Sequence, residues 1–361
     1  MAFDTSLPIW AGMREAERSI RIWLMTMIVL VAAMIVLGGA TRLTNSGLSI
    51  TEWLPVRGAL PPMSEGAWQV EFAKYQQIDE FRLEHPDMTL SGFKFIYFWE
   101  WAHRLLGRVI GLAFVLPLVW FALKKRLPKG FGLPLLGIGI LIGLQGVIGW
   151  WMVHSGLQDG MVAVSQYRLA THLGMAFLVL GSLVWMWKAA GPAGEPVARS
   201  GLTKLTGGLV FAQIVAGAFV AGTHSGKTYN SWPMMDGDIV PSGYSQMEPF
   251  WLNWFENPAA IQFNHRALAY VILALGIYIF VRAPKGTAYR KTAGIFKGLL
   301  LWQVVLGIWT LLAVAPLWLS LLHQFSAVLL FLATMLLMWE GRAKKALNEY
   351  GIDIPLGQAA E

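Results

Sequence analysis

The chain has 361 residues, of which 56% are hydrophobic and only 14% are charged. A soluble globular protein carries about 25% charged residues, so this composition excludes a water-soluble enzyme and favours a protein that crosses a membrane several times. The net charge of +7 does not predict nucleic-acid binding, because membrane proteins keep basic loops on their cytoplasmic side. The absence of cysteine excludes disulfides, thiolate catalysis and cysteine-held iron–sulfur clusters.

Eight apolar segments are long enough to cross a bilayer as helices, which takes about 20 residues each. We expect them at residues 22–40, 95–122, 132–153, 168–187, 204–222, 259–281, 295–315 and 317–339. The first is too long for the apolar core of a secretory signal, and acidic residues before it argue against a mitochondrial leader. The predicted fold class is therefore an all-α integral membrane protein.

The loops between these segments differ in charge. Loop 123–131, loop 282–297 and the tail after residue 339 are rich in lysine and arginine, whereas loops 43–94 and 223–258 are acidic on balance. Short basic loops stay in the cytoplasm. We therefore expect both termini to be cytoplasmic and the long loops, including the stretch 42–94, to lie on the outer face.

The two halves of the chain share motifs. Residues 38–53 align without a gap on residues 217–232, with a glycine, a Thr-x-Ser-Gly string and a tryptophan at matching places. A His-Arg pair and a Gln-x-x-x-Gly string also recur. Four crossings separate the halves, which gives them the same orientation in the membrane. We therefore predict two four-helix bundles related by a pseudo-twofold axis, at residues 1–200 and 201–361.

Four histidines each open an even-numbered segment at a similar depth, and they are His103, His172, His265 and His323. Two imidazoles from facing helices in each half suit the axial ligands of a b-type haem. Zinc or copper would require further ligands nearby. The alternative is that each histidine only makes a hydrogen bond between helices, but four at matched depth favour haem.

Three more histidines lie outside these segments or at their ends. His85 falls in the acidic loop and is expected to be a solvated loop residue. His154 and His224 fall at the outer ends of the third and fifth segments, and no role is predicted for either.

Glu100 is the most informative single residue of the sequence, because burying a carboxylate inside a membrane segment costs free energy. It lies one turn before His103, and the matching residue in the second half is Gln262. A buried acid there suits a general base, a proton relay or an electrostatic stabiliser. The alternative is a structural ion pair with Arg104 or Arg108. We favour a catalytic role because only one half has the acid.

Arginines accompany the histidines at the same level. Arg104 and Arg266 directly follow His103 and His265, and Arg42 ends the first segment. These guanidinium groups are predicted either to bind haem propionates or to anchor the helices at the membrane interface. Their recurrence in both halves favours propionates.

Three strings resemble those of the haem A synthase family: residues 38–50 with Trp53, residues 96–108 and residues 145–157. The chain is most similar to the proteobacterial and mitochondrial branch, which has no cysteine pairs in its loops. This resemblance implies a protein of the bacterial inner membrane that oxidises a methyl group of haem O to a formyl group by successive hydroxylations. The product, haem A, serves haem–copper oxidases.

The resemblance also implies roles by position. His103 and His172 match the pair that holds the substrate haem, and His265 and His323 match the pair that binds the iron of a haem b cofactor. Glu100 matches an acid tied to catalysis. Haem O and membrane lipid are the implied partners, and the farnesyltransferase that makes haem O and a second copy of the chain are candidate protein partners. The electron carrier and the oxygen source are not predicted.

Two other functions compete with this one. A di-haem b membrane cytochrome that exchanges electrons with quinone would explain the four histidines, but it leaves the asymmetry between Glu100 and Gln262 unexplained. A transporter with a duplicated fold is the second alternative, and it gives no reason for paired imidazoles.

Overall fold

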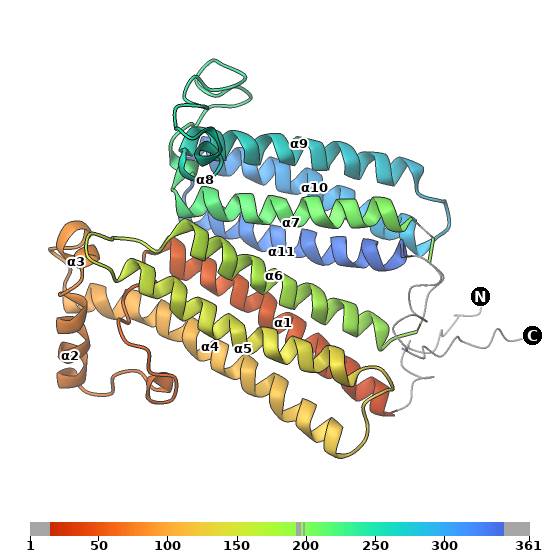
Figure 1. Cartoon of the computed structure of the whole chain (residues 1–361), viewed down its shortest axis with the longest axis horizontal. Coiled ribbons are helices and arrows are strands. Elements are labelled where there is room, and N and C mark those ends of the chain that lie inside the picture. The colour runs from red at the N-terminus through yellow and green to blue at the C-terminus, as the bar shows by residue number, and fades with distance from the viewer. Residues whose placement is uncertain (1–14, 193–195, 198, 343–361) are drawn as a thin grey trace, which may run out of the picture.

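The structure is a computed structural model that describes residues 15–192, 196–197 and 199–342. In that part of the chain, eight helices are long and apolar enough to cross a membrane (Figure 1). They are α1 (Glu15–Leu43), α4 (Leu90–Leu123), α5 (Gly132–Gly156), α6 (Gln166–Ala189), α7 (Ser200–Gly222), α9 (Pro258–Arg282), α10 (Ala288–Leu312) and α11 (Leu317–Glu340). The predicted all-α fold with eight spans is confirmed.

Several of these helices begin earlier than the apolar pattern predicts, and at α4 and α10 a polar cap starts the helix. The side chain of Thr89 accepts a hydrogen bond from the Gly92 amide, which starts α4 ahead of its apolar stretch. Thr287 caps α10 in the same way, by accepting from the amide of Arg290. The first turns of both helices are therefore amphipathic extensions of the membrane-spanning parts.

The eight helices form two layers of four (Figure 1). In one layer α1 packs against α4 and α6, and α5 packs against the same two helices. In the other layer α7 packs against α9 and α11, and α10 packs against the same two helices. This grouping follows the predicted halves, although the domain boundary and the pseudo-twofold axis stay predictions.

A continuous apolar core joins the two layers. Phe177 of α6 packs edge-on against Phe331 of α11, with ring centroids 5.0 Å apart. Nearer the other end of the same helices, Trp185 and Trp339 are 5.1 Å apart. Because one buried cluster contains side chains from both halves, the halves are packed as a single unit.

The long loops lie at one end of the molecule, which we call the loop end (Figure 1). The first loop contains η1 (Arg57–Ala59), α2 (Glu65–Tyr75) and α3 (Asp79–Glu84), and the second contains η2 (Ser225–Lys227), η3 (Phe250–Leu252) and α8 (Asn253–Glu256). The first loop has its own small aromatic core, in which Phe72 and Tyr75 pack against Phe93 of α4. It is therefore a folded cap over the first half.

Candidate functional site

In the first half, the two intramembrane histidines pack against glycines of neighbouring helices. A Cβ atom at Gly38 of α1 would lie 2.9 Å from Cε1 of His103 in α4. A Cβ atom at Gly149 of α5 would also lie 2.9 Å from Cε1 of His172 in α6. No ordinary side chain fits at such distances, so glycine is what lets each imidazole approach the adjacent backbone.

The second half repeats this arrangement. A Cβ atom at Gly217 of α7 would lie 3.2 Å from Cε1 of His265 in α9. The same distance separates a Cβ atom at Gly307 of α10 from Cε1 of His323 in α11. Each of the four predicted histidines therefore packs against a glycine of a neighbouring helix, two in each half.

The geometry of the first pair fits two axial ligands of one metal. The ring centroids of His103 and His172 are 6.5 Å apart, and the ring planes are inclined by 62°. Two metal–imidazole bonds of about 2 Å, with each nitrogen about 1 Å from its ring centre, would put the centroids about 6 Å apart. In the described part of the chain, Nδ1 of both rings is buried without a hydrogen-bond partner. The residues present therefore fit a haem.

The ring nitrogens of the second pair have glutamine neighbours, because Nε2 of Gln213 lies 3.2 Å from Nδ1 of His265 and Nε2 of Gln303 lies 3.3 Å from Nε2 of His323. His265 and His323 lie close enough to interact electrostatically. Nδ1 of His323 is buried and has no partner among the residues that the structure describes. Within the same residues, no group of three or more His, Cys, Asp or Glu side chains is arranged to hold a metal ion. That each imidazole pair binds a haem stays a prediction.

Glutamine side chains tie three of the four histidines to a neighbouring helix. The Nε2 atom of each glutamine donates to the histidine's own backbone carbonyl oxygen, and the pairs are Gln145 with His172 at 2.8 Å, Gln213 with His265 at 3.0 Å, and Gln303 with His323 at 3.1 Å. These are the glutamines of the recurring Gln-x-x-x-Gly string. The string therefore places a glycine against the ring and an amide donor one turn away.

Glu100 is buried and fully hydrogen-bonded. Its side chain is 3% exposed, and Oε1 accepts from Nη2 of Arg104 at 2.6 Å. Oε2 accepts from the hydroxyl of Ser49 at 2.8 Å and from the backbone amide of Ile50 at 2.7 Å. The structural ion pair weighed above is thus present with Arg104. The catalytic role of Glu100 stays a prediction.

Arg104 and Arg266 make the same contacts in the two halves. Arg104 donates to the carbonyl oxygens of Ile50 at 2.7 Å and Glu52 at 2.9 Å. Arg266 donates to the carbonyl oxygens at the matching positions of the repeat, Tyr229 at 2.7 Å and Ser231 at 3.0 Å. Both arginines therefore fasten the loop that follows the first helix of their half.

These contacts bear on the predicted propionate ligands. A haem propionate at Arg104 or Arg266 would have to accept hydrogen bonds from N–H groups that already donate to loop carbonyl oxygens. Propionate binding by these arginines therefore stays a prediction. The i, i+4 spacing of Glu100 with Arg104, and of Gln262 with Arg266, is the sequence signal that indicates these two side-chain contacts.

Arg42 links the two halves at the loop end. Its Nη2 atom lies 3.0 Å from Nε2 of His224 and 3.4 Å from the carbonyl oxygen of Ala221. Partial burial of the His224 ring, and then the positive charge of Arg42, lower the pKa of His224. The neutral imidazole can therefore accept this bond at neutral pH, which gives His224 a bridging role that the sequence did not indicate.

A buried acidic cluster lies in the first loop. The hydroxyl of Tyr75 donates to Oε2 of Glu80 at 3.1 Å and lies 2.9 Å from Nδ1 of His85. Glu80 is 5% exposed and Tyr75 is 0% exposed. Burial, and then the charge of Glu100, raise the pKa of Glu80 to about 7, although the hydrogen bond from Tyr75 opposes this shift. The prediction that His85 is a solvated loop residue was wrong, because α2 and α3 fold it onto Tyr75.

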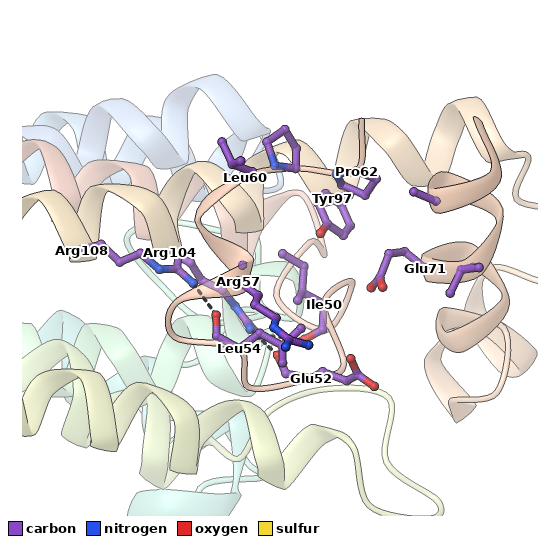
Figure 2. A pocket seen from close by; sticks show the side chains of 14 residues that line it. Ile50, Glu52, Leu54, Arg57, Leu60, Pro62, Glu71, Tyr97, Arg104 and Arg108 are labelled. Atoms are coloured by element: carbon purple, nitrogen blue, oxygen red, sulfur yellow. Dashed lines mark hydrogen bonds between the residues drawn. The ribbon is translucent and has the colours of Figure 1, made fainter. Parts of the chain in front are cut away.

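A cavity of about 380 Å³ lies between the first loop, α2 and α4. Figure 2 shows Arg104 and Arg108 reaching from α4 towards Leu54 at its wall, with Tyr97 and Glu71 across the space. Arg104 therefore contacts both this cavity and the buried Glu100. Sequence reasoning missed the cavity, because its walls come from segments that only the folded loop brings together.

The chain that holds these residues is similar to known proteins over most of its length. A family model described as cytochrome oxidase assembly protein matches residues 21–335. A protein named haem A synthase from Maricaulis maris is 48% identical over 333 residues, which cover 90% of this chain and 97% of that protein. Haem A synthases from Paracoccus denitrificans, at 47% identity, and Bartonella tribocorum, at 45%, cover 89% and 87% of this chain, and 87% and 90% of their own lengths.

Proposed function

The chain belongs to the cytochrome oxidase assembly protein family, and from this membership we propose that it is a haem A synthase. Such an enzyme oxidises a methyl group of haem O to a formyl group by successive hydroxylations. The observation that carries the proposal is the His103–His172 pair, whose 6.5 Å centroid separation fits axial ligation, in a chain 48% identical over 333 residues to a haem A synthase.

The first half is proposed to hold the substrate. His103 and His172 would bind the iron of haem O. Gly38 and Gly149 have no side chain that would push the two imidazole rings away. Only this half has a carboxylate beside its histidine pair, namely Glu100. Its proposed task is to bind and orient the macrocycle beside that acid.

The second half is proposed to hold haem b through His265 and His323. When bound, haem b supplies one-electron redox chemistry. Both histidine carbonyls are held by glutamine donors, at 3.0 and 3.1 Å. Such fixed helices suit a cofactor that stays in place through turnover.

Glu100 is proposed to take up a proton released as the methyl group is oxidised. The atom that would receive it is Oε2, because the Ser49 hydroxyl bonded there can rotate away, whereas Oε1 is held by Arg104. Gln262 cannot do this, which gives the asymmetry between the halves a chemical meaning.

We place the enzyme in the bacterial inner membrane, with both termini cytoplasmic and the loop end outside. The charge of the loops supports this orientation. The proposed partners are haem O, membrane lipid, the farnesyltransferase that makes haem O, and a second copy of the chain.

Pigment extraction tests the proposal. The protein would be purified from a host that makes haem O, and its acid-extracted haems would be separated by chromatography and mass. Haem A or hydroxylated haem O in the extract is expected. Two equivalents of haem b and no oxidised haem O would instead favour the di-haem cytochrome.

A further inference from the structure

At three of the four histidines a glutamine of a neighbouring helix donates a hydrogen bond to the histidine's carbonyl oxygen, and we call this contact a glutamine clasp. The clasp is missing at the fourth histidine. Gln145, Gln213 and Gln303 stand four residues before the glycine that faces a histidine. In α1 the residue four positions before Gly38 is Met34. The histidine that faces Gly38 is His103, which is therefore the one whose carbonyl has no glutamine donor in the described part of the chain.

Met34 occupies the matching place without providing a polar group. Its Cε atom lies 3.4 Å from where a Cβ atom of Gly107 would be, so the side chain covers α4 one turn beyond His103. Methionine has nearly the length of glutamine but no N–H donor, and its thioether is a weak acceptor. The contact between α1 and α4 at this level is therefore apolar, whereas the other three contacts are hydrogen-bonded.

In the second half the glutamine side chains also reach the imidazoles, because Nε2 of Gln213 lies 3.2 Å from Nδ1 of His265 and Nε2 of Gln303 lies 3.3 Å from Nε2 of His323. The Oε1 atoms of Gln145, Gln213 and Gln303 are buried and have no partner among the described residues. His103 has no such amide beside it from α1, so its carbonyl oxygen lacks the glutamine donor that the other three histidines have.

This asymmetry matches the different demands on the two halves. A substrate must leave after oxidation, while a cofactor stays. The second half clasps both of its histidines, through Gln213 and Gln303. The first half clasps only His172, through Gln145.

Resting on the proposed function, we propose that His103 is the exchangeable axial ligand, through which the haem is taken up and released, and that Gln145 makes His172 the permanent ligand. Met34 is then a positioning residue whose apolar side chain keeps His103 weakly held. Adding an amide at position 34 should convert the first half into a tight cofactor-like site.

Haem transfer to an excess of apomyoglobin measures this directly, because it follows haem loss rather than turnover. Wild-type protein loaded with haem should lose it in a fast phase from the first half and a slow phase from the second. One added hydrogen bond should slow the fast phase of Met34→Gln about fivefold. Met34→Leu, which adds no donor, should leave the fast phase unchanged.

A second variant keeps the idea testable if Met34→Gln does not fold. Gln145→Met removes the clasp on His172 and should raise the rate of the fast phase, and it should also let added imidazole displace a protein ligand, seen in the Soret band. An unchanged fast phase in both Met34→Gln and Gln145→Met would overturn the proposal. The identity of the extracted haem tests the enzyme activity separately, so either result can fail alone.

Discussion

Glu100 and Gln262 accept the same bond from the arginine one turn further along their helices, at 2.6 Å in each case. They differ in what the second atom does. Oε2 of Glu100 accepts from the amide of Ile50, while Nε2 of Gln262 donates to the carbonyl oxygen of Ser225 at 2.6 Å. The arginine thus bonds to a carboxylate in the first half and to a side-chain amide in the second half.

This relationship predicts that Glu100→Gln abolishes oxidation while the protein still binds haem. The amide can keep the bond from Arg104, but it cannot accept a proton at the second atom. We expect the rate of haem O oxidation to fall at least about a hundredfold, as for the loss of a general base. Haem content and Soret spectrum should be close to those of the wild type.

The reciprocal variant, Gln262→Glu, is the matched control. It places an acid in the half that is proposed to hold haem b and not the substrate. It should neither raise the activity of the wild type nor restore activity when it is combined with Glu100→Gln. Limited proteolysis of residues 44–89 would show whether the loop is still fastened. Full turnover by a folded, haem-loaded Glu100→Gln protein would exclude the catalytic role.

The glycines facing the imidazoles predict selective loss of haem. Gly38→Ala puts a methyl group 2.9 Å from the His103 ring, and Gly307→Ala puts one 3.2 Å from the His323 ring. Overpacking of this kind costs about 1–3 kcal/mol. Gly38→Ala should therefore weaken haem binding in the first half only, and Gly307→Ala in the second half only, as measured by haem per chain.

Gly146→Ala is the control for these variants, because nothing lies within 4 Å of the added methyl group. It should retain the full haem content. Equal losses in all three variants would point to general destabilisation of the helices instead of a steric effect on the imidazoles.

The sequence was sufficient for the elements that depend on local pattern. The eight spans follow from apolar length, and the pairing of His103 with His172 follows from their matched depth in neighbouring helices. The repeat also predicted the equivalence of Arg104 and Arg266, but not what they bind. Their donors go to Ile50 and Tyr229 because the loops fold back onto the helices, which apolar periodicity does not encode.

What the sequence could not give depends on the tertiary fold of the long loops. Glu80 looks like one of many acids in a polar loop, and it is buried only because α2 and α3 pack on α4. Arg42 and His224 are far apart in the chain and come from different halves. Contacts of this kind arise from how the loops pack, and neither composition nor spacing marks them in advance.

The burial of Glu80 predicts a pH-dependent loop. Its pKa is about 7 in the folded protein against 4.5 for an ordinary glutamate, so the folded loop holds the proton more tightly. By linkage the contribution of Glu80 to stability is greatest below pH 4.5 and is lost as the pH rises from about 4.5 through about 7. Hydrogen exchange of the amides in residues 64–89, corrected for intrinsic rates, should show protection falling over that range.

The groups around Glu80 set the controls. Tyr75 donates to it from α2, Arg42 stabilises its charge from α1, and Glu84 and Glu100 oppose that charge from α3 and α4. Glu80→Gln should make protection nearly independent of pH between 5 and 7. Glu65→Gln, at an exposed position on α2, should retain the wild-type pH dependence. The same pH dependence in Glu80→Gln would assign it to another group.

The last prediction concerns the contact between the halves. Gln324, next to His323 on α11, donates from Nε2 to the carbonyl oxygen of Ile35 on α1 at 2.7 Å. A Cβ atom at Gly39 would overlap the Gln324 amide. Gly39→Ala should therefore push α1 and α11 apart, by a steric cost of about 1–3 kcal/mol, and lower the unfolding temperature in detergent.

Removing the Gln324 side chain tests whether this steric overlap causes the loss of stability. Gln324→Ala alone should cost about 1 kcal/mol through the lost hydrogen bond. Combined with Gly39→Ala, it makes room for the new methyl group, so the double variant should be more stable than the sum of the two single losses predicts. Simple additivity in this double-mutant cycle would mean that Gly39 is needed for some reason other than close approach to Gln324. Because Gln324 adjoins a proposed haem ligand and Ile35 lies near Gly38, the same variants should also change the haem spectra of both halves together.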